Sequence, residues 1–300
     1  MTRSRPIRIL LAFVLCAPFL SAECAQDHRS NKNAGILVTD FTISGTQALS
    51  ATEMARMTSD LTGSCFDDDS EEMGERIRAL FQERGYFSVE VKHVGFKPGD
   101  PLGIPKPVTL EADVSEGPVY KLADIIFLDN HAFSAERLRQ AFPLKKGDVF
   151  SRGKVASGLE SLRRLYGSRG FLDYTAVPET EPSSNASMRL KISVQEGPQY
   201  HMGKLEIAAA KESAGRLRME WKLPEGAVYD HSYLDKYIEA NRDLLPPGFT
   251  RENASTVSDC PHALVDVTLI VDSDAKSPQP PPKDVPCEET PTIPNSHTGR

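Results

Sequence analysis

Apolar side chains recur along the chain with two different periods, which predict short strands and amphipathic helices. Short apolar runs predict a strand early in each of three segments, at 36–43, 122–128 and 205–209. Two helices follow, and the second has the clearest apolar stripe, as in Met73, Ile77, Leu80 and Phe81. Two further strands close each segment, at 86–94 with 108–114, 171–177 with 188–194, and 249–257 with 264–271. Strand, helix, helix, strand, strand predicts an α+β fold.

Local signals mark where several helices begin and end. Ser50 and Glu53 form the pattern of a capping box, which predicts the start of the first helix of the first segment. Ser134 is expected to open the corresponding helix of the second segment, and Pro143 to terminate it. A glycine at 85 or 170 is expected to end the second helix in the left-handed conformation.

Three short motifs recur in the same order with a period of about 80 residues, which indicates an internal repeat. Val-Ser-Glu-Gly-Pro at 114–118 returns as Val-Gln-Glu-Gly-Pro at 194–198, each followed two residues on by tyrosine. Arg-Gly-Tyr at 84–86 returns as Arg-Gly-Phe at 169–171. A glycine three residues before an aromatic occurs at 63–66, 147–150 and 226–229. We therefore expect three tandem β-α-α-β-β units, at 34–118, 119–201 and 202–273, each a three-stranded sheet with two helices on one face.

These motifs and this element order resemble POTRA (polypeptide-transport-associated) domains, which form the periplasmic part of outer-membrane barrel-assembly and two-partner-secretion proteins. The third unit is the most divergent, because it lacks the closing Glu-Gly-Pro and carries Leu-Pro-Pro-Gly at 245–248. The segment after Val271 is expected to be too short for the many alternating strands of a membrane barrel.

The resemblance implies that the strand after the second helix binds an extended polypeptide by edge-strand augmentation, through main-chain hydrogen bonds. In this chain the segments are 86–91 and 171–177, and the expected partner-binding residues are Tyr86, Phe87, Val89, Val91, Phe171, Leu172, Tyr174 and Val177. The alternative is that neighbouring units cover both edges and the strands are only structural. Pro118 and Pro198 are expected to stiffen the joints between units.

The first residues predict export. Arg3, Arg5 and Arg8 precede an apolar run that ends at Leu20 and is followed by small residues, the pattern of a signal peptide over 1–22. An uncleaved membrane anchor is the alternative, although the run is shorter than the roughly 20 apolar residues that span a bilayer. At the other end, residues 274–300 are rich in proline and are expected to be a disordered tail.

Composition excludes one class of partner. The chain has 39% hydrophobic and 26% charged residues, a formal charge of −7 and a pI near 5.6. Non-specific nucleic-acid binding needs a basic surface, and a single tryptophan leaves few stacking platforms for bases. We therefore expect no nucleic-acid partner.

No pattern predicts a catalytic or metal site. The cysteines that remain after export, Cys24, Cys65, Cys260 and Cys287, contain no CxxC pair. A bridge between Cys260 and Cys287 is one open pairing. By the repeat register Cys65 takes the place of a valine, so we expect a buried, unpaired thiol rather than a nucleophile.

The remaining candidates for chemistry have simpler interpretations. The acidic run at 67–69, continued by Glu71 and Glu72, is expected to cap a helix rather than bind calcium, because the calcium-loop pattern is absent. The histidines occur singly, and Asp230 beside His231 is expected to cap the second helix of the third unit. Residues 95–101 are expected to form a turn-rich insertion between two strands.

The leading hypothesis is an exported, non-enzymatic scaffold without cofactors, located in the periplasm and peripheral to the outer membrane. Its expected partners are unfolded polypeptide clients or an outer-membrane β-barrel protein. The alternative is a structural envelope protein that docks one fixed partner, as in division-type POTRA proteins.

Overall fold

A computed structural model describes residues 36–46, 49–63, 65–66, 70–99, 106–183 and 185–272. The predicted signal peptide, the acidic run at 67–69 and the proline-rich tail lie outside these ranges. The described residues form two compact bodies, one ending at Val119 and one beginning at Tyr120, and the second contains two of the three sheets.

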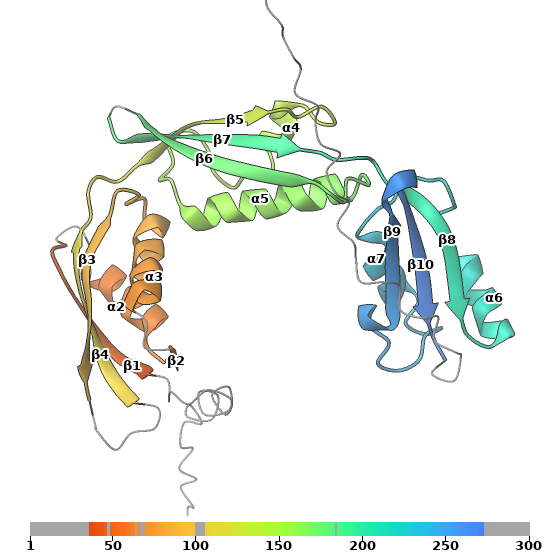
Figure 1. Ribbon diagram of the computed structural model, residues 1–300, viewed down its shortest axis with the longest axis horizontal. Helices are drawn as coiled ribbons and strands as arrows, with labels where there is room; N and C mark the ends of the chain where they lie inside the picture. Colours follow the sequence, from red (N-terminus) through yellow and green to blue (C-terminus); the bar gives the residue numbers. More distant parts are fainter. Residues whose placement is uncertain are drawn as a thin grey trace, which may run out of the picture. The chain divides into compact units, whose positions relative to one another are not determined.

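The first body contains β1 (Ile36–Ser44), α2 (Ala51–Leu61), β2 (Cys65–Phe66), α3 (Ser70–Glu83), β3 (Glu90–Pro98) and β4 (Lys106–Ser115). Its sheet has the order β2-β1-β4-β3, with β1 parallel to β4 and β3 antiparallel to β4. The two-residue strand β2 makes this sheet four-stranded where the sequence predicts three. α3 lies against one face of the sheet (Figure 1).

The second sheet is built from β5 (Lys121–Leu128), β6 (Thr175–Ser183) and β7 (Ser187–Gln195), in the order β5-β7-β6. Two helices, α4 (Ala135–Arg139) and α5 (Arg152–Gly167), separate β5 from β6 in the chain. β5 runs parallel to β7, and β6 forms a hairpin with β7. α5 extends along one face of this sheet (Figure 1).

The third sheet has the order β8-β10-β9, from β8 (His201–Ala208), β9 (Ala254–Asp259) and β10 (Leu264–Ile270). Its helices are α6 (Lys211–Glu220) and α7 (Tyr233–Ala240), and two short 3-10 helices, η2 (Arg251–Asn253) and η3 (Cys260–His262), flank β9. The three sheets share one topology, since the first long strand of each runs parallel to the last. The α+β repeat predicted from the sequence is confirmed.

Several predicted strand limits are wrong. β3, β6 and β9 begin at Glu90, Thr175 and Ala254 rather than at 86, 171 and 249. The residues in between fold into tight turns, in which the N–H of Phe87 donates to the carbonyl of Gly85 at 3.1 Å. β8 begins at His201, four residues before the predicted start, and β3 continues through residues 95–98, which were expected to form a turn-rich insertion.

The predicted helix signals correspond to real caps. The capping box of Ser50 and Glu53 is formed at the start of α2, and the Ser134 side chain accepts the N–H of Arg137 to cap α4. Gly85 and Gly170 adopt φ of +92° and +81°, the left-handed conformation that residues with a Cβ rarely adopt. α4 ends at Arg139, before Pro143, so the proline is not its terminator.

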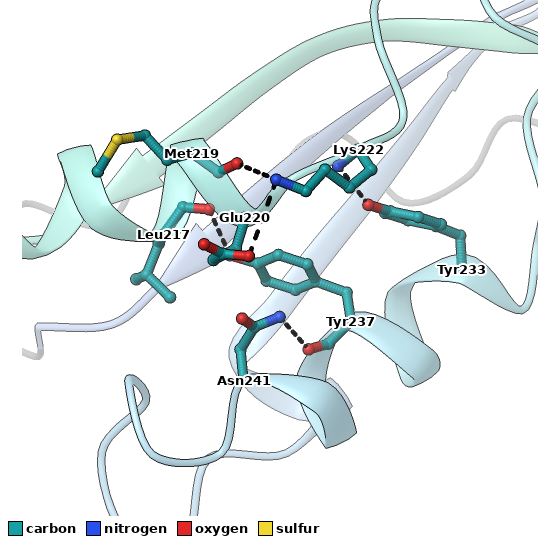
Figure 2. A network of polar contacts seen from close by, with 7 residues as sticks. All are labelled: Leu217, Met219, Glu220, Lys222, Tyr233, Tyr237 and Asn241. Atoms are coloured by element: carbon teal, nitrogen blue, oxygen red, sulfur yellow. Dashed lines mark hydrogen bonds and ion pairs between the residues drawn. The ribbon is translucent and has the colours of Figure 1, made fainter.

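Each unit has its own core, formed by the helix stripes and the inward faces of the strands. In the first unit Met73, Ile77 and Phe81 of α3 are completely buried. In the third unit the buried face of α7 is followed by a polar residue, because Asn241, which caps the end of this helix, is also buried. Figure 2 shows how this is accommodated: the Asn241 amide donates to the carbonyl of Tyr237 at 2.8 Å, and the Tyr237 hydroxyl donates to the carbonyl of Leu217 at 2.7 Å.

The recurring glycine before an aromatic places a short extended segment beside the first strand of each unit. Gly63, Gly147 and Gly226 have φ between +80° and +88°. Two residues later the chain pairs with the first strand, as Cys65 with Leu37, Val149 with Lys121 and Val228 with His201. The side chains of Val149 and Val228 are 39% and 37% exposed. The Cys65 side chain lies outside the described part, so its predicted burial stays a prediction, and its two counterparts do not support it.

Candidate functional site

The first predicted binding segment, 86–91, is largely built into the core of its own unit. Tyr86 and Val89 are buried, and the Tyr86 ring meets the Phe81 ring edge-on with 5.9 Å between centroids. Phe87 is half-buried, and Val91 packs partly buried against the same core. These side chains therefore hold the unit together, and what the region offers to a partner is the backbone of β3.

β3 is an edge strand with an open side. Among the described strands it pairs with β4 alone. The N–H of Gly99, one residue beyond β3, donates to the carbonyl of Pro107 at 2.8 Å. Because residues of an antiparallel strand alternately face their partner and face away, the residues of β3 whose backbone groups point away from the sheet are Val94, Phe96 and Pro98.

The second predicted segment, 171–177, is occupied by contacts inside the second body. Leu172 packs against the core of the third unit. The Tyr174 ring stacks on the Tyr166 ring, with centroids 4.1 Å apart and planes 14° from parallel, and Phe171 meets Tyr166 edge-on. Val177 is 52% exposed. Three of the four predicted residues in this segment therefore have structural contacts.

Two prolines alter the free edge of β6. Pro178 and Pro182 lie opposite Ile192 and Met188 of β7. A proline has no N–H for the ladder, so prolines in sheets are found where that position faces away from the neighbouring strand. The two prolines are four residues apart, so their backbone nitrogens face the same side of the strand. The outward-facing residues of β6 are therefore Ala176, Pro178, Thr180 and Pro182. Half of the N–H donors on this edge are absent, which is a known protection against strand addition.

Tyr200 joins the second and third units. Its ring is completely buried in the third core, its N–H donates to the carbonyl of Gly170 at 2.8 Å, and its hydroxyl donates to Asp173 at 2.8 Å. Burial, together with Asp173, raises the pKa of Tyr200 to about 12. Burial also raises the pKa of Tyr174 to about 12, and the enclosed Tyr174 hydroxyl has no hydrogen-bond partner among the described residues. Both phenols stay neutral across the physiological range.

Glu196, in the second copy of the Glu-Gly-Pro motif, has a structural role as a hydrogen-bond acceptor. One carboxylate oxygen accepts the backbone N–H groups of His131 and Ala132, at 2.8 and 2.9 Å, and the hydroxyl of Tyr166 at 2.9 Å. The glutamate after β7 therefore fixes the loop after β5. In the first unit Glu116 accepts the hydroxyl of Thr46, in the loop after β1.

The third unit keeps this arrangement without the motif. Asp272, just after β10, accepts the N–H of Ala210 at 2.6 Å, in the turn between β8 and α6. The Glu-Gly-Pro motif does not identify this residue, because the third unit lacks the motif. The signal that does identify it is an acidic residue just after the last strand of each unit.

β9 lies at the edge of the third sheet, in the position that β3 and β6 occupy in the first two sheets. It pairs with β10, and its six residues contain no proline. Cys260, directly after it, is disulfide-bonded. Cys24 and Cys287, its candidate partners from the sequence, lie outside the described residues, and so does the side chain of Cys65.

Reactive groups do not gather in the described residues. They contain no group of three or more His, Cys, Asp and Glu side chains able to hold a metal ion. Asp230 accepts the N–H of Ser232 at 2.9 Å in the turn before α7, but the N-cap residue of this helix is Ser232 and no side chain caps it, so the predicted capping role of Asp230 is wrong. Burial and the nearby guanidinium of Arg251 lower the pKa of His231, so this imidazole is neutral at pH 7.

None of the helices in the described part of the chain combines the length and apolar character needed to cross a bilayer.

Comparison with known families and structures agrees with this geometry. Residues 120–197 match the family model POTRA, described as surface antigen variable number repeat. A crystal structure of BamA POTRA domains 3–5 from Haemophilus influenzae aligns with a TM-score of 0.52 at 20% identity, covering 78% of this chain and 95% of that chain. At 20% sequence identity, this similarity shows a shared fold.

Two curated relatives are similar in sequence. A protein of Treponema pallidum (strain Nichols) named "putative outer membrane protein assembly factor" is 25% identical over 209 residues, which are 68% of this chain and 24% of the relative. The outer membrane protein assembly factor BamA of Neisseria meningitidis serogroup B is 24% identical over 125 residues, 38% of this chain and 16% of the relative. The matches span a quarter or less of each relative.

Proposed function

We propose that this chain is a tandem of POTRA domains that acts as a non-enzymatic scaffold for outer-membrane protein assembly or secretion. The match of residues 120–197 to the POTRA family model and the fold shared with the BamA POTRA domains of Haemophilus influenzae support this proposal. It binds polypeptides by adding an extended segment to the edge of a sheet. The proposed location is the periplasm, at the surface of the outer membrane. The proposed partners are unfolded polypeptide clients and an outer-membrane β-barrel protein.

The observation that carries this proposal is the open edge of β3. The strand is nine residues long, and its outward-facing Val94 and Phe96 each present an N–H and a carbonyl to an incoming chain. Main-chain pairing of this kind tolerates many sequences, which suits clients that share β-strand character and little else. The only proline of β3 is its last residue, Pro98, so the remainder of the edge keeps its donors.

The same argument makes β6 the poorer edge. An extended segment added to β6 would meet proline at two of four outward-facing positions, whereas one added to β3 meets it only at the end. Of the two segments predicted from sequence we therefore infer that the first binds clients, through β3, and that the edge of β6 in the second unit does not bind them.

A proline scan of the two edges tests this function. Val94→Pro removes an outward N–H from β3, and the lost hydrogen bond to the bound peptide costs about 1 kcal/mol. A steric clash between the proline ring and the peptide adds to this cost. We expect the affinity of the full chain for a fluorescent, alternating apolar–polar strand peptide to fall about tenfold, as measured by anisotropy.

Two controls separate binding from folding. Val94→Ala removes the side chain of the same residue but keeps its N–H, and should bind the peptide like the wild type. Ala176→Pro places the same ring on an outward-facing position of β6, and should change the affinity little. Equal losses for Val94→Pro and Val94→Ala would contradict augmentation at β3. Recovery of one stoichiometric partner that is not a barrel, with no peptide binding, would favour the fixed-partner alternative.

A further inference from the structure

A hollow of about 390 Å³ lies in the second unit, beside the first part of the segment that was predicted to bind partners. Its lining comes from the loop before α4, from the end of α5 and from the linker to the third unit, and consists of Ala132, Phe133, Arg169, Phe171 and Gln199. The proline-bearing edge of β6 does not contribute to it. The second unit therefore has a concave surface that differs in kind from a strand edge.

The aromatic walls of this hollow are held in place from behind. Phe133 and Phe171 both meet the ring of Tyr166 edge-on, with centroid separations of 4.9 and 5.8 Å. Tyr166 is completely buried and donates its hydroxyl to Glu196, which also fixes the backbone of Ala132. Walls that do not need to reorganise lower the entropic cost of binding.

The rim of the hollow carries an uncompensated positive charge. Arg169 is exposed, and within the described residues its guanidinium takes part in no ion pair or hydrogen bond. The Gln199 amide donates to the backbone carbonyl of Arg169 at 2.9 Å, which leaves the guanidinium available. Glu196, the acid behind the walls, already accepts three hydrogen bonds through one oxygen. A ligand with a carboxylate at the rim complements this charge.

We propose that the hollow is a side-chain anchor site, which takes an aromatic side chain of a partner polypeptide whose neighbouring residue is aspartate or glutamate. The ring enters between Phe133 and Phe171, and the carboxylate pairs with Arg169. The proposal rests on the proposed function only in that the ligand is a polypeptide; the surface is distinct from β3. It gives the second unit a binding mode that does not need the edge of β6.

Three short peptides test the site in the uniformly ¹⁵N-labelled full chain: acetyl-Glu-Phe-Glu-amide, acetyl-Lys-Phe-Lys-amide and acetyl-Glu-Ala-Glu-amide. We expect saturable shifts of the Ala132, Phe133 and Gln199 amides with the first peptide, and affinities about five-fold lower or worse for the other two. The chain has a net charge of −7, so its overall field favours the lysine peptide. A preference for the acidic peptide must therefore arise locally.

Charge reversal completes the test. Arg169→Glu should invert the order of the two phenylalanine peptides, while Arg164→Glu, at an exposed position on α5, should leave it unchanged. Equal binding of the glutamate and lysine peptides, or an order unchanged by Arg169→Glu, overturns the proposal. Shifts confined to β3 would also overturn it, and would leave the proposed augmentation standing.

Discussion

Replacing Gly158 with alanine is expected to destabilise the second body by about 1–3 kcal/mol, the usual cost of overpacking a core. Gly158 is a buried residue of α5, and a Cβ placed on it would lie 2.1 and 2.3 Å from two ring carbons of Phe142. The Phe142 ring is itself buried and cannot simply swing into solvent. The steric cost therefore outweighs the gain of about 1 kcal/mol that alanine normally brings to a helix interior.

Gly215 provides the matched control, since it is also inside a helix but exposed. A Cβ at this position of α6 meets nothing within 4 Å. Gly215→Ala should therefore stabilise the third unit, by up to about 1 kcal/mol. Urea unfolding followed by far-ultraviolet circular dichroism, and by the fluorescence of Trp221 for the third unit, measures both variants. Changes of the same sign for the two variants would contradict the packing described for α5.

The second large effect is expected for Glu196→Ala. Three donors lose their shared acceptor, and one of them, the hydroxyl of Tyr166, belongs to a completely buried side chain. A buried donor left without a partner costs about 1–3 kcal/mol. We expect a loss of stability of roughly that size and faster hydrogen exchange at the amides of His131 and Ala132.

Glu196→Gln is the control for this prediction. Glutamine keeps one acceptor oxygen at the same place, so the loop after β5 should stay ordered and the loss of stability should be well below that of alanine. Hydrogen exchange read by NMR distinguishes the two variants. Slow exchange at His131 and Ala132 in the alanine variant would show that the loop is held by something other than the motif glutamate.

Much of the fold could be predicted because its signals are local. The glycines at 85 and 170 require the left-handed conformation, the Ser50 and Glu53 side chains close a capping box within one turn, and the stripe of Met73, Ile77 and Phe81 marks the buried face of α3. Each of these depends on residues a few positions apart. The repetition of the whole pattern then identified three units.

The binding surfaces were harder to predict, because they depend on contacts between residues far apart in the chain. Tyr86 and Val89 are apolar and occur next to an edge strand, but their side chains face the core of their own unit. Leu172 packs on the following unit, which no local pattern shows. Glu196 acts on His131, 65 residues earlier.

One signal was present in the sequence and was missed. The predicted strand at 171–177 stopped just before Pro178, whereas β6 runs from Thr175 to Ser183 and includes Pro182 as well. With the correct limits, the prolines alone mark β6 as a protected edge. The error in the strand boundary therefore became an error in ranking the two candidate edges.

Hydrogen exchange at the backbone of β3 tests the central claim most directly. The amides of Val94 and Phe96 face away from the sheet and should exchange rapidly in the full chain alone. When a saturating concentration of an outer-membrane β-strand peptide is added, both should become protected, while the amides of Ala176 and Thr180 in β6 should not. Binding of the peptide with Val94 and Phe96 still exchanging rapidly would contradict the account.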